Sequence, residues 1–151
     1  EFNVFKLRTM YAYAEYIQHY VYEKHQLGEG GKFHDDFRVT TPGRILRKLW
    51  LDELPMVINV LRGQMKIVGV RPLSRHYFSL YTPEMQALRT RVKPGLIPPF
   101  YAQHPTPTSL DEVQKNEETY LRAYLRNPLL TDLKYFFLAM FNIVWRRARS
   151  R

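Results

Sequence analysis

Residues 43–55 read Gly-Arg-Ile-Leu-Arg-Lys-Leu-Trp-Leu-Asp-Glu-Leu-Pro, a short basic segment directly before two adjacent acids, Asp52 and Glu53. Pro55 lacks an amide hydrogen and is best tolerated in the first turn of a helix. The sequence therefore predicts a helix that starts near Asp52, continues through an apolar stretch and stops at Gly63.

Other helices are predicted on both sides of this stretch. One runs from about Arg8 to Gln26, where apolar residues recur at helical spacing ahead of a glycine-rich loop. The run Thr82-Pro83-Glu84 is typical of a helix start, and Ser109 with Glu112 fits a capping box. These signals indicate a chain made mostly of helices.

The last predicted helix begins at Thr131 or Asp132. From Leu133 to Trp145 only Lys134 and Asn142 interrupt apolar residues, and four arginines follow before the end of the sequence. An apolar helix with aromatic residues and a basic end is typical of a lipid interface. An ordinary core helix with a solvated tail fits the same pattern, and composition does not separate the two.

Strand signals are few. Lys66 to Val70 is a short apolar run with strand character, and residues 94–107 contain five prolines, which predict an extended loop. We expect an α-rich α/β fold, a single domain over residues 1–151 with several helices, some amphipathic, around a small sheet or hairpin. No stretch approaches the ~20 apolar residues that span a bilayer.

Composition narrows the classes of function. The 151 residues are 45% apolar and 15% aromatic, unlike a disordered tail, and the formal charge is +9. A field of that sign attracts phosphate groups on nucleic acids, nucleotides or anionic lipids, although it also simply aids solubility. The absence of cysteine excludes disulfides, thiolate catalysis and cysteine-bound zinc.

Asp52 and Glu53 are the strongest candidates for chemistry. Adjacent residues on a helix point about 100° apart, so the two acids do not face each other as in a glycosidase. At a helix start both acids stay ionised near exposed amides, which suits a nucleophile or a metal ligand. Arg47 lies five residues earlier and is placed to help hold a phosphate. In isolation, however, the pair also fits a simple helix cap.

A longer set of motifs favours the chemical interpretation. In order, the chain contains Lys6-Leu7-Arg8-Thr9-Met10, Asp36-Phe37-Arg38-Val39-Thr40, Gly43 to Lys48, Leu51 to Pro55, Asn59 to Gly63, Ile67 to Leu73 and Val92-Lys93-Pro94-Gly95. This ordered set resembles the bacterial sugar transferase family, the monotopic polyprenyl-phosphate phosphoglycosyl transferases. The resemblance extends from Phe5 to about Phe137.

The resemblance implies an activity and a set of partners. Such enzymes initiate surface glycan assembly at the cytoplasmic face of the bacterial inner membrane. They move a sugar-1-phosphate from a UDP-sugar to undecaprenyl phosphate, with Mg²⁺ required.

The resemblance also implies residue roles. Asp52 matches the family nucleophile, which forms a covalent phosphosugar intermediate, and Glu53 matches its partner. Both are expected to bind the metal. Lys6, Arg47 and Arg71 match positions near the phosphates. Asp132 matches a late family acid at the same site, with a helix cap as the alternative.

The chain also departs from the family pattern. The hydrophobic N-terminal membrane helix of the family is missing from this sequence, Val70 replaces the first proline of the usual Pro-Arg-Pro, and Met56 stands where glutamine is common. Residues 96–100 replace the usual Ile-Thr-Gly stretch, so the sugar is not predicted. Two alternatives stay open: a catalytically silent membrane-bound scaffold, and a basic nucleic-acid-binding domain, although no nucleic acid is expected as partner.

Overall fold

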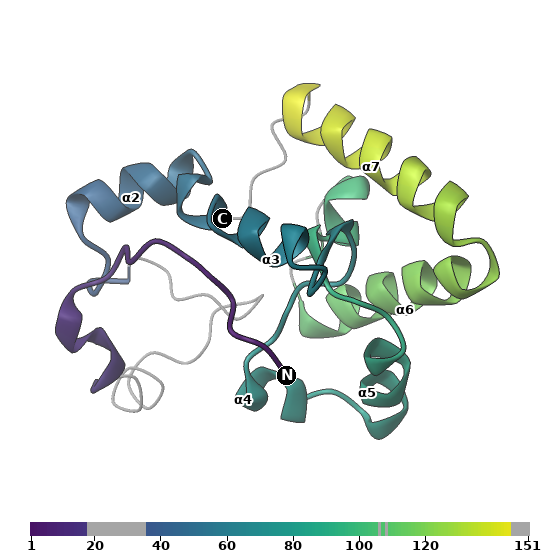
Figure 1. The fold of residues 1–151 in the computed structure, drawn as a ribbon, viewed down its shortest axis with the longest axis horizontal. Coiled ribbons are helices and arrows are strands. Elements are labelled where there is room, and N and C mark those ends of the chain that lie inside the picture. The colour runs from purple at the N-terminus through teal and green to yellow at the C-terminus, as the bar shows by residue number, and fades with distance from the viewer. Residues whose placement is uncertain (18–35, 106, 108, 146–151) are drawn as a thin grey trace. The chain divides into compact units, whose positions relative to one another are not determined.

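The computed structural model describes residues 1–17, 36–105, 107 and 109–145. The chain divides into two compact units, Glu1–Asn59 and Val60–Arg151, and the boundary falls inside helix α3 (Met56–Leu61). The described residues are mostly helical, with one small parallel sheet, as the sequence predicted (Figure 1). None of the described helices is long and apolar enough to cross a membrane.

The first unit contains the short 3-10 helix η1 (Ala12–Glu15), helix α2 (Thr41–Lys48) and the 3-10 turn η2 (Leu51–Glu53). Helix α2 begins where the Thr40 hydroxyl accepts a hydrogen bond from the Gly43 amide at 3.0 Å. Such a cap satisfies one of the amides left unpaired at a helix start. The unit therefore brings a basic helix directly before the two acids.

The helix predicted from Arg8 to Gln26 is wrong over residues 8–17. The rest of that range lies outside the described residues. Met10 forms an isolated antiparallel bridge with Val39, and the Tyr11 amide donates to the Arg38 carbonyl at 3.0 Å. Met10 and Tyr11 thus pair with a distant segment, and the helical part of this region is only the short 3-10 helix η1. Apolar periodicity alone does not reveal such long-range pairing.

The second unit is organised around strands β1 (Lys66–Val68) and β2 (Gly95–Ile97), which pair in parallel with Lys66 opposite Gly95. The connection between them holds helices α4 (Arg75–Ser79) and α5 (Pro83–Thr90). A Cβ atom on Gly95 would lie 2.0 Å from the Gly69 backbone nitrogen, so this close approach requires glycine. The extended loop predicted over residues 94–107 is therefore wrong for Gly95–Ile97, because these residues pair with β1 as a strand.

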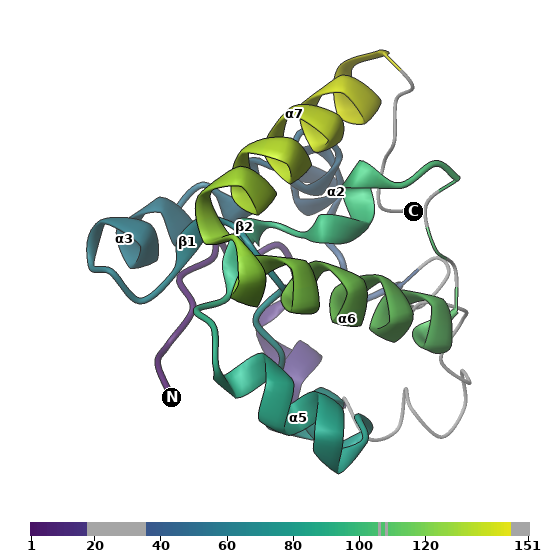
Figure 2. The ribbon, with the colours of Figure 1, turned by 90° about the vertical axis from the view of Figure 1, so that its right-hand side faces the viewer.

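The C-terminal part of the second unit contains η3 (Pro99–Ala102), α6 (Leu110–Arg126) and α7 (Pro128–Trp145). Helices α6 and α7 pack against each other, and α7 also contacts η3 and β1 (Figure 2). The caps of α5 and α6, Thr82 and Ser109, are confirmed. Helix α7 begins at Pro128, not at Thr131 or Asp132, because proline is well suited to the first position of a helix.

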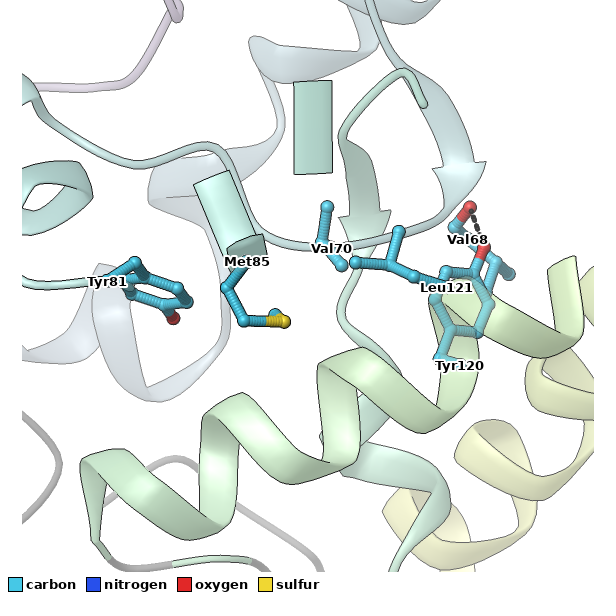
Figure 3. Packing of buried hydrophobic residues seen from close by; sticks show 6 residues of the cluster. All are labelled: Val68, Val70, Tyr81, Met85, Tyr120 and Leu121. Carbon is cyan, nitrogen blue, oxygen red and sulfur yellow. Dashed lines mark hydrogen bonds between the residues drawn. The ribbon is translucent and has the colours of Figure 1, made fainter. Parts of the chain in front are cut away.

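The core of the second unit lies between the sheet and helices α5 and α6. Its buried residues come from all three and include Val68, Val70, Met85, Tyr120 and Leu121 (Figure 3). Figure 3 also shows the Tyr120 hydroxyl turned to the carbonyl of Val68, with 3.2 Å between the two oxygens. The tyrosine thus satisfies its polar end while burying its ring.

Helix α7 is only partly buried, and the side chains that it leaves exposed are mostly large and apolar. Its buried residues are Thr131, Ala139 and Asn142, and the Asn142 amide donates to the Tyr101 carbonyl at 3.0 Å. Large apolar side chains are exposed along the rest of the helix, at Leu129, Leu130, Leu133, Phe137, Leu138, Met140, Phe141, Val144 and Trp145. Positions 130, 133, 137, 141 and 144 follow helical spacing, so they form one continuous apolar face.

Candidate active site

The N-terminal segment lies directly against the two acids of η2. The Lys6 ammonium donates to the Glu53 carboxylate at 2.8 Å, and the Leu7 amide donates to the Asp52 backbone carbonyl at 3.0 Å. Lys6 keeps 38% of its side-chain surface exposed and Glu53 keeps 22%. The structure therefore brings three of the predicted site residues together, Lys6 and Glu53 through their side chains and Asp52 through its backbone.

Asn59 fixes the same segment one turn of α3 further on. Its side-chain oxygen accepts from the Phe5 amide at 3.1 Å, and its side-chain nitrogen donates to the Asn3 carbonyl at 2.8 Å. Asn59 is completely buried, so its amide is committed to holding the backbone next to Lys6. No local sequence pattern predicts this role, because the partners lie more than fifty residues apart.

Thr9 connects the segment to Arg47. The Arg47 guanidinium donates to the Thr9 hydroxyl at 2.9 Å, while the Thr9 carbonyl accepts from the amide and the hydroxyl of Thr40. A Cβ atom on Gly43 would lie 2.1 Å from the Thr9 carbonyl oxygen, so only glycine allows this contact at the start of α2. The N-terminal segment thus holds Arg47 as well as the turn with the acids.

A buried ion pair lies just before Val39 and Thr40, the residues that pair with Met10 and Thr9. Arg38 donates to Asp36 from two guanidinium nitrogens, at 2.8 and 2.7 Å, and is only 2% exposed. Burial raises the pKa of Asp36, but the hydrogen bonds and charge of Arg38 outweigh it and hold that pKa below its ordinary value. A carboxylate that is ionised and bonded in the folded protein stabilises it at neutral pH.

Asp52 lies in η2 rather than in the first turn of a longer helix. The chain enters η2 through Trp50, whose φ of 58° is left-handed and ends α2. The residue Asp52 is only 8% exposed, and within the described part of the first unit no hydrogen bond or ion pair engages its carboxylate. The helix predicted to start near Asp52 begins at Met56 instead, after the η2 turn. A carboxylate without a committed partner suits a nucleophile.

Arg71 lies three residues after β1 in the second unit, and its backbone carbonyl accepts a hydrogen bond from a buried arginine. Arg89, near the end of α5, donates to the Arg71 carbonyl at 2.5 Å and also pairs with Glu117 of α6. Burial raises the pKa of Glu117, against the opposing influence of Arg89 and of a hydrogen bond with Tyr81. No sequence pattern predicted the ion pair between Arg89 and Glu117.

Asp132 binds a lysine on the strand. The Lys66 ammonium lies 2.9 and 2.8 Å from its two carboxylate oxygens and 3.4 Å from the ring centre of Tyr124. The Tyr120 hydroxyl donates to the same carboxylate at 2.6 Å. Burial lowers the pKa of Lys66, although Asp132 counteracts it. Asp132 is not a helix cap, because α7 begins four residues before it.

The donor set for a metal is small. Among the residues that the structure describes, no group of three or more histidine, aspartate or glutamate side chains is suited to hold a metal ion. Asp52 and Glu53 offer two carboxylates in consecutive positions. Mg²⁺ is often bound by one or two carboxylates together with substrate phosphates, so this donor set fits a metal completed by substrate.

Comparison with known proteins decides the family. A family model described as bacterial sugar transferase matches residues 1–146. The chain belongs to the bacterial sugar transferase family. That resemblance, first suggested by the motifs around Asp52, is therefore confirmed over nearly the whole chain.

Two of the relatives in this family carry the names of different sugars. The sugar transferase EpsL of Bacillus subtilis is 41% identical over 95 residues, 63% of this chain and 41% of that protein. The galactosyl transferase CpsE of Streptococcus agalactiae is 31% identical over 141 residues, 92% of this chain and 30% of that protein. A UDP-glucose:undecaprenyl-phosphate glucose-1-phosphate transferase of Klebsiella pneumoniae is 38% identical over 112 residues, 71% of this chain and 24% of that protein. The chain thus spans less than half the length of these relatives.

Proposed function

We propose that this chain is the catalytic part of a phosphoglycosyl transferase that moves a sugar-1-phosphate from a UDP-sugar to undecaprenyl phosphate. The observation that carries the proposal is the Asp52-Glu53 turn, held by Lys6 and Leu7 in a chain of this family. The printed name of the Klebsiella relative describes that same reaction with glucose. The proposed product initiates a surface polysaccharide.

Asp52 is the proposed nucleophile. A carboxylate oxygen of Asp52 attacks the phosphorus next to the sugar, the bond between the two phosphates breaks, and UMP leaves with that electron pair. An oxygen of undecaprenyl phosphate then attacks the same phosphorus, which releases the Asp52 carboxylate and forms the lipid-linked diphosphate sugar. Covalent catalysis of this kind splits one difficult transfer into two easier displacements.

The neighbouring cations have separate tasks in this proposal. Lys6 orients Glu53, and Arg47, held by Thr9, supplies positive charge for the phosphates of the nucleotide. Arg71 is proposed to bind phosphate as well. When Mg²⁺ is bound, by Asp52 and Glu53, it screens the diphosphate from the attacking carboxylate.

The exposed face of α7 supports a location at a membrane surface. A long-chain polyprenyl acceptor is confined to a lipid bilayer, and α7 presents a continuous apolar face ending in Trp145 at 74% exposure. Interfacial helices bury such a face at the boundary between headgroups and acyl chains. We place the protein at the cytoplasmic face of the inner membrane, where nucleotide sugars are made.

One assay tests the function. The full-length protein is incubated with a panel of UDP-sugars, undecaprenyl phosphate and Mg²⁺, and release of UMP is measured. Release that needs both the lipid acceptor and Asp52 supports the proposal. DNA binding without UMP release from any donor favours a nucleic-acid-binding domain, and membrane binding with full inactivity favours a silent scaffold.

A further inference from the structure

A buried charged group lies behind the backbone of Arg71. Arg89 is 7% exposed and Glu117 is 1% exposed, so both charges have left water. One terminal guanidinium nitrogen of Arg89 donates to Glu117, and the other donates to the Arg71 carbonyl at 2.5 Å. The guanidinium carbon also lies 4.9 Å from the ring centre of Tyr81. The guanidinium therefore joins α5, α6 and the turn after β1.

Stability alone is a weak explanation for such a group. Removing two charges from water is costly, and replacing a buried ion pair by apolar residues of similar volume is often neutral or stabilising. This pair contributes hydrogen bonds of fixed direction. A planar guanidinium presents its donors in a fixed fork, and here two of the donors have different acceptors. A lysine at position 89 carries a single ammonium that does not reproduce this fork.

The acceptor in the turn is a specific backbone group. Pro72 follows Arg71, and the residue before a proline is restricted to extended backbone. The bond from Arg89 then fixes the carbonyl of that residue. With both constraints, the direction in which the Arg71 side chain leaves the backbone is set before any substrate binds, which lowers the ordering cost of binding.

We propose that Arg89 is a positioning residue for Arg71, and that the Arg89–Glu117 pair holds the Arg71 turn so that its guanidinium meets the phosphates of the nucleotide sugar. The identity of the substrate in this inference rests on the proposed function. The hydrogen bond by which Arg89 holds the Arg71 carbonyl does not depend on it. In this role Arg89 acts on the substrate only through the backbone of Arg71.

The chain offers matched controls. Glu118 follows Glu117 and forms an exposed ion pair with Arg122 on the same helix, with side chains 42% and 67% exposed. Arg91 lies two residues after Arg89 and is exposed. Glu118→Gln and Arg91→Lys therefore repeat the chemical changes of Glu117→Gln and Arg89→Lys without touching the buried pair.

The experiment combines a double-mutant cycle with hydrogen exchange in the full-length protein. We expect Arg89→Lys to lower kcat/KM for UMP release tenfold or more, and to have less than a twofold effect in an Arg71→Ala background. Peptides covering residues 70–77 should exchange faster in Arg89→Lys, and not in Arg91→Lys. If Arg89→Lys does not fold, Glu117→Gln with Glu118→Gln as control carries the same measurements.

Two results would overturn the inference. Unchanged exchange over residues 70–77 would show that Arg89 does not hold the turn. An equal loss of kcat/KM with and without the Arg71 side chain would show that Arg89 does not act through it. If the wild-type protein transfers no sugar, the proposed function fails instead. Hydrogen exchange over residues 70–77 then decides by itself whether Arg89 holds the Arg71 turn.

Discussion

The ammonium of Lys6 lies 2.8 Å from the carboxylate of Glu53, forty-seven residues further along the chain. We expect Lys6→Met to lower kcat/KM for UMP release at least tenfold, because Glu53 loses its orienting cation beside Asp52. Exposed ion pairs stabilise proteins by only about 0–1 kcal/mol, so the free energy of unfolding should change little. Steady-state kinetics with thermal unfolding checks both expectations.

Arg8→Met is the matched control for this change. Arg8 lies two residues further along the same segment, is exposed, and loses the same charge. An equal loss of activity in Arg8→Met would mean that general positive charge, not the contact with Glu53, supports catalysis.

Asp132 is expected to stabilise the second unit through Lys66. Asp132→Asn should lower the free energy of unfolding by about 1–2 kcal/mol, less than for a fully buried pair because both side chains retain some exposure. The double variant Lys66→Met, Asp132→Leu removes both charges and should recover most of that loss. Urea unfolding of the three proteins measures the effect.

The same double variant separates two roles of Asp132. If Asp132 only positions α7 on the strand, recovered stability should restore UMP release. Activity that stays lost in a stable double variant would instead assign Asp132 a contact with substrate.

The local part of this fold could be predicted from the sequence, and the non-local part could not. Thr82 and Ser109 each bond an amide three residues away, so their caps are visible in a short window. Met10 pairs with Val39 instead, and no nearby residue signals that contact. Strand β2 was missed for the same reason, since it pairs with the distant strand β1 and the prolines on both sides of it, Pro94 and Pro98, favour a loop.

The candidate site divides in the same way. The motifs identified Lys6, Arg47, Asp52 and Glu53 as site residues, and their roles stay predictions. Thr9 and Asn59 lie within those motifs, but no role as supporting residues was predicted for them, because threonine and asparagine are common in loops and caps. Buried supports of this kind become visible only when distant segments are placed side by side.

Acid should weaken the first unit through Asp36. Its folded pKa is held below the ordinary 3.8, so the stability it contributes is present above that value and is lost as the pH falls through the folded pKa. One such group changes the free energy of unfolding by at most about 1.4 kcal/mol per pH unit. Asp36→Asn should flatten the stability profile below pH 3.8.

Fluorescence of Trp50 reports on this unit when Trp145 is replaced by phenylalanine. Asp111→Asn, an exposed acid at the start of α6, is the control and should leave the profile of the first unit unchanged. A profile that keeps its slope in Asp36→Asn would contradict the assigned role of the Asp36–Arg38 pair.

The apolar face of α7 should bind anionic lipid vesicles. Replacing Phe137 by glutamine should lower the partition coefficient roughly fivefold, corresponding to about 1 kcal/mol for a partly inserted side chain. Flotation with phosphatidylglycerol vesicles measures it. Ile67→Gln is the control, because Ile67 is also exposed but lies on β1. Equal losses in the two variants would exclude α7 as the lipid-binding face.

Asp52 is expected to become covalently bonded to the sugar-phosphate during the reaction. Incubating the full-length protein with its UDP-sugar and Mg²⁺, without polyprenyl phosphate, isolates the first displacement. We expect about one UMP released per protein chain and a sugar-phosphate adduct on the peptide that contains Asp52, with neither in Asp52→Asn. Wild-type turnover by Asp52→Asn, or an adduct on a different residue, would contradict the account.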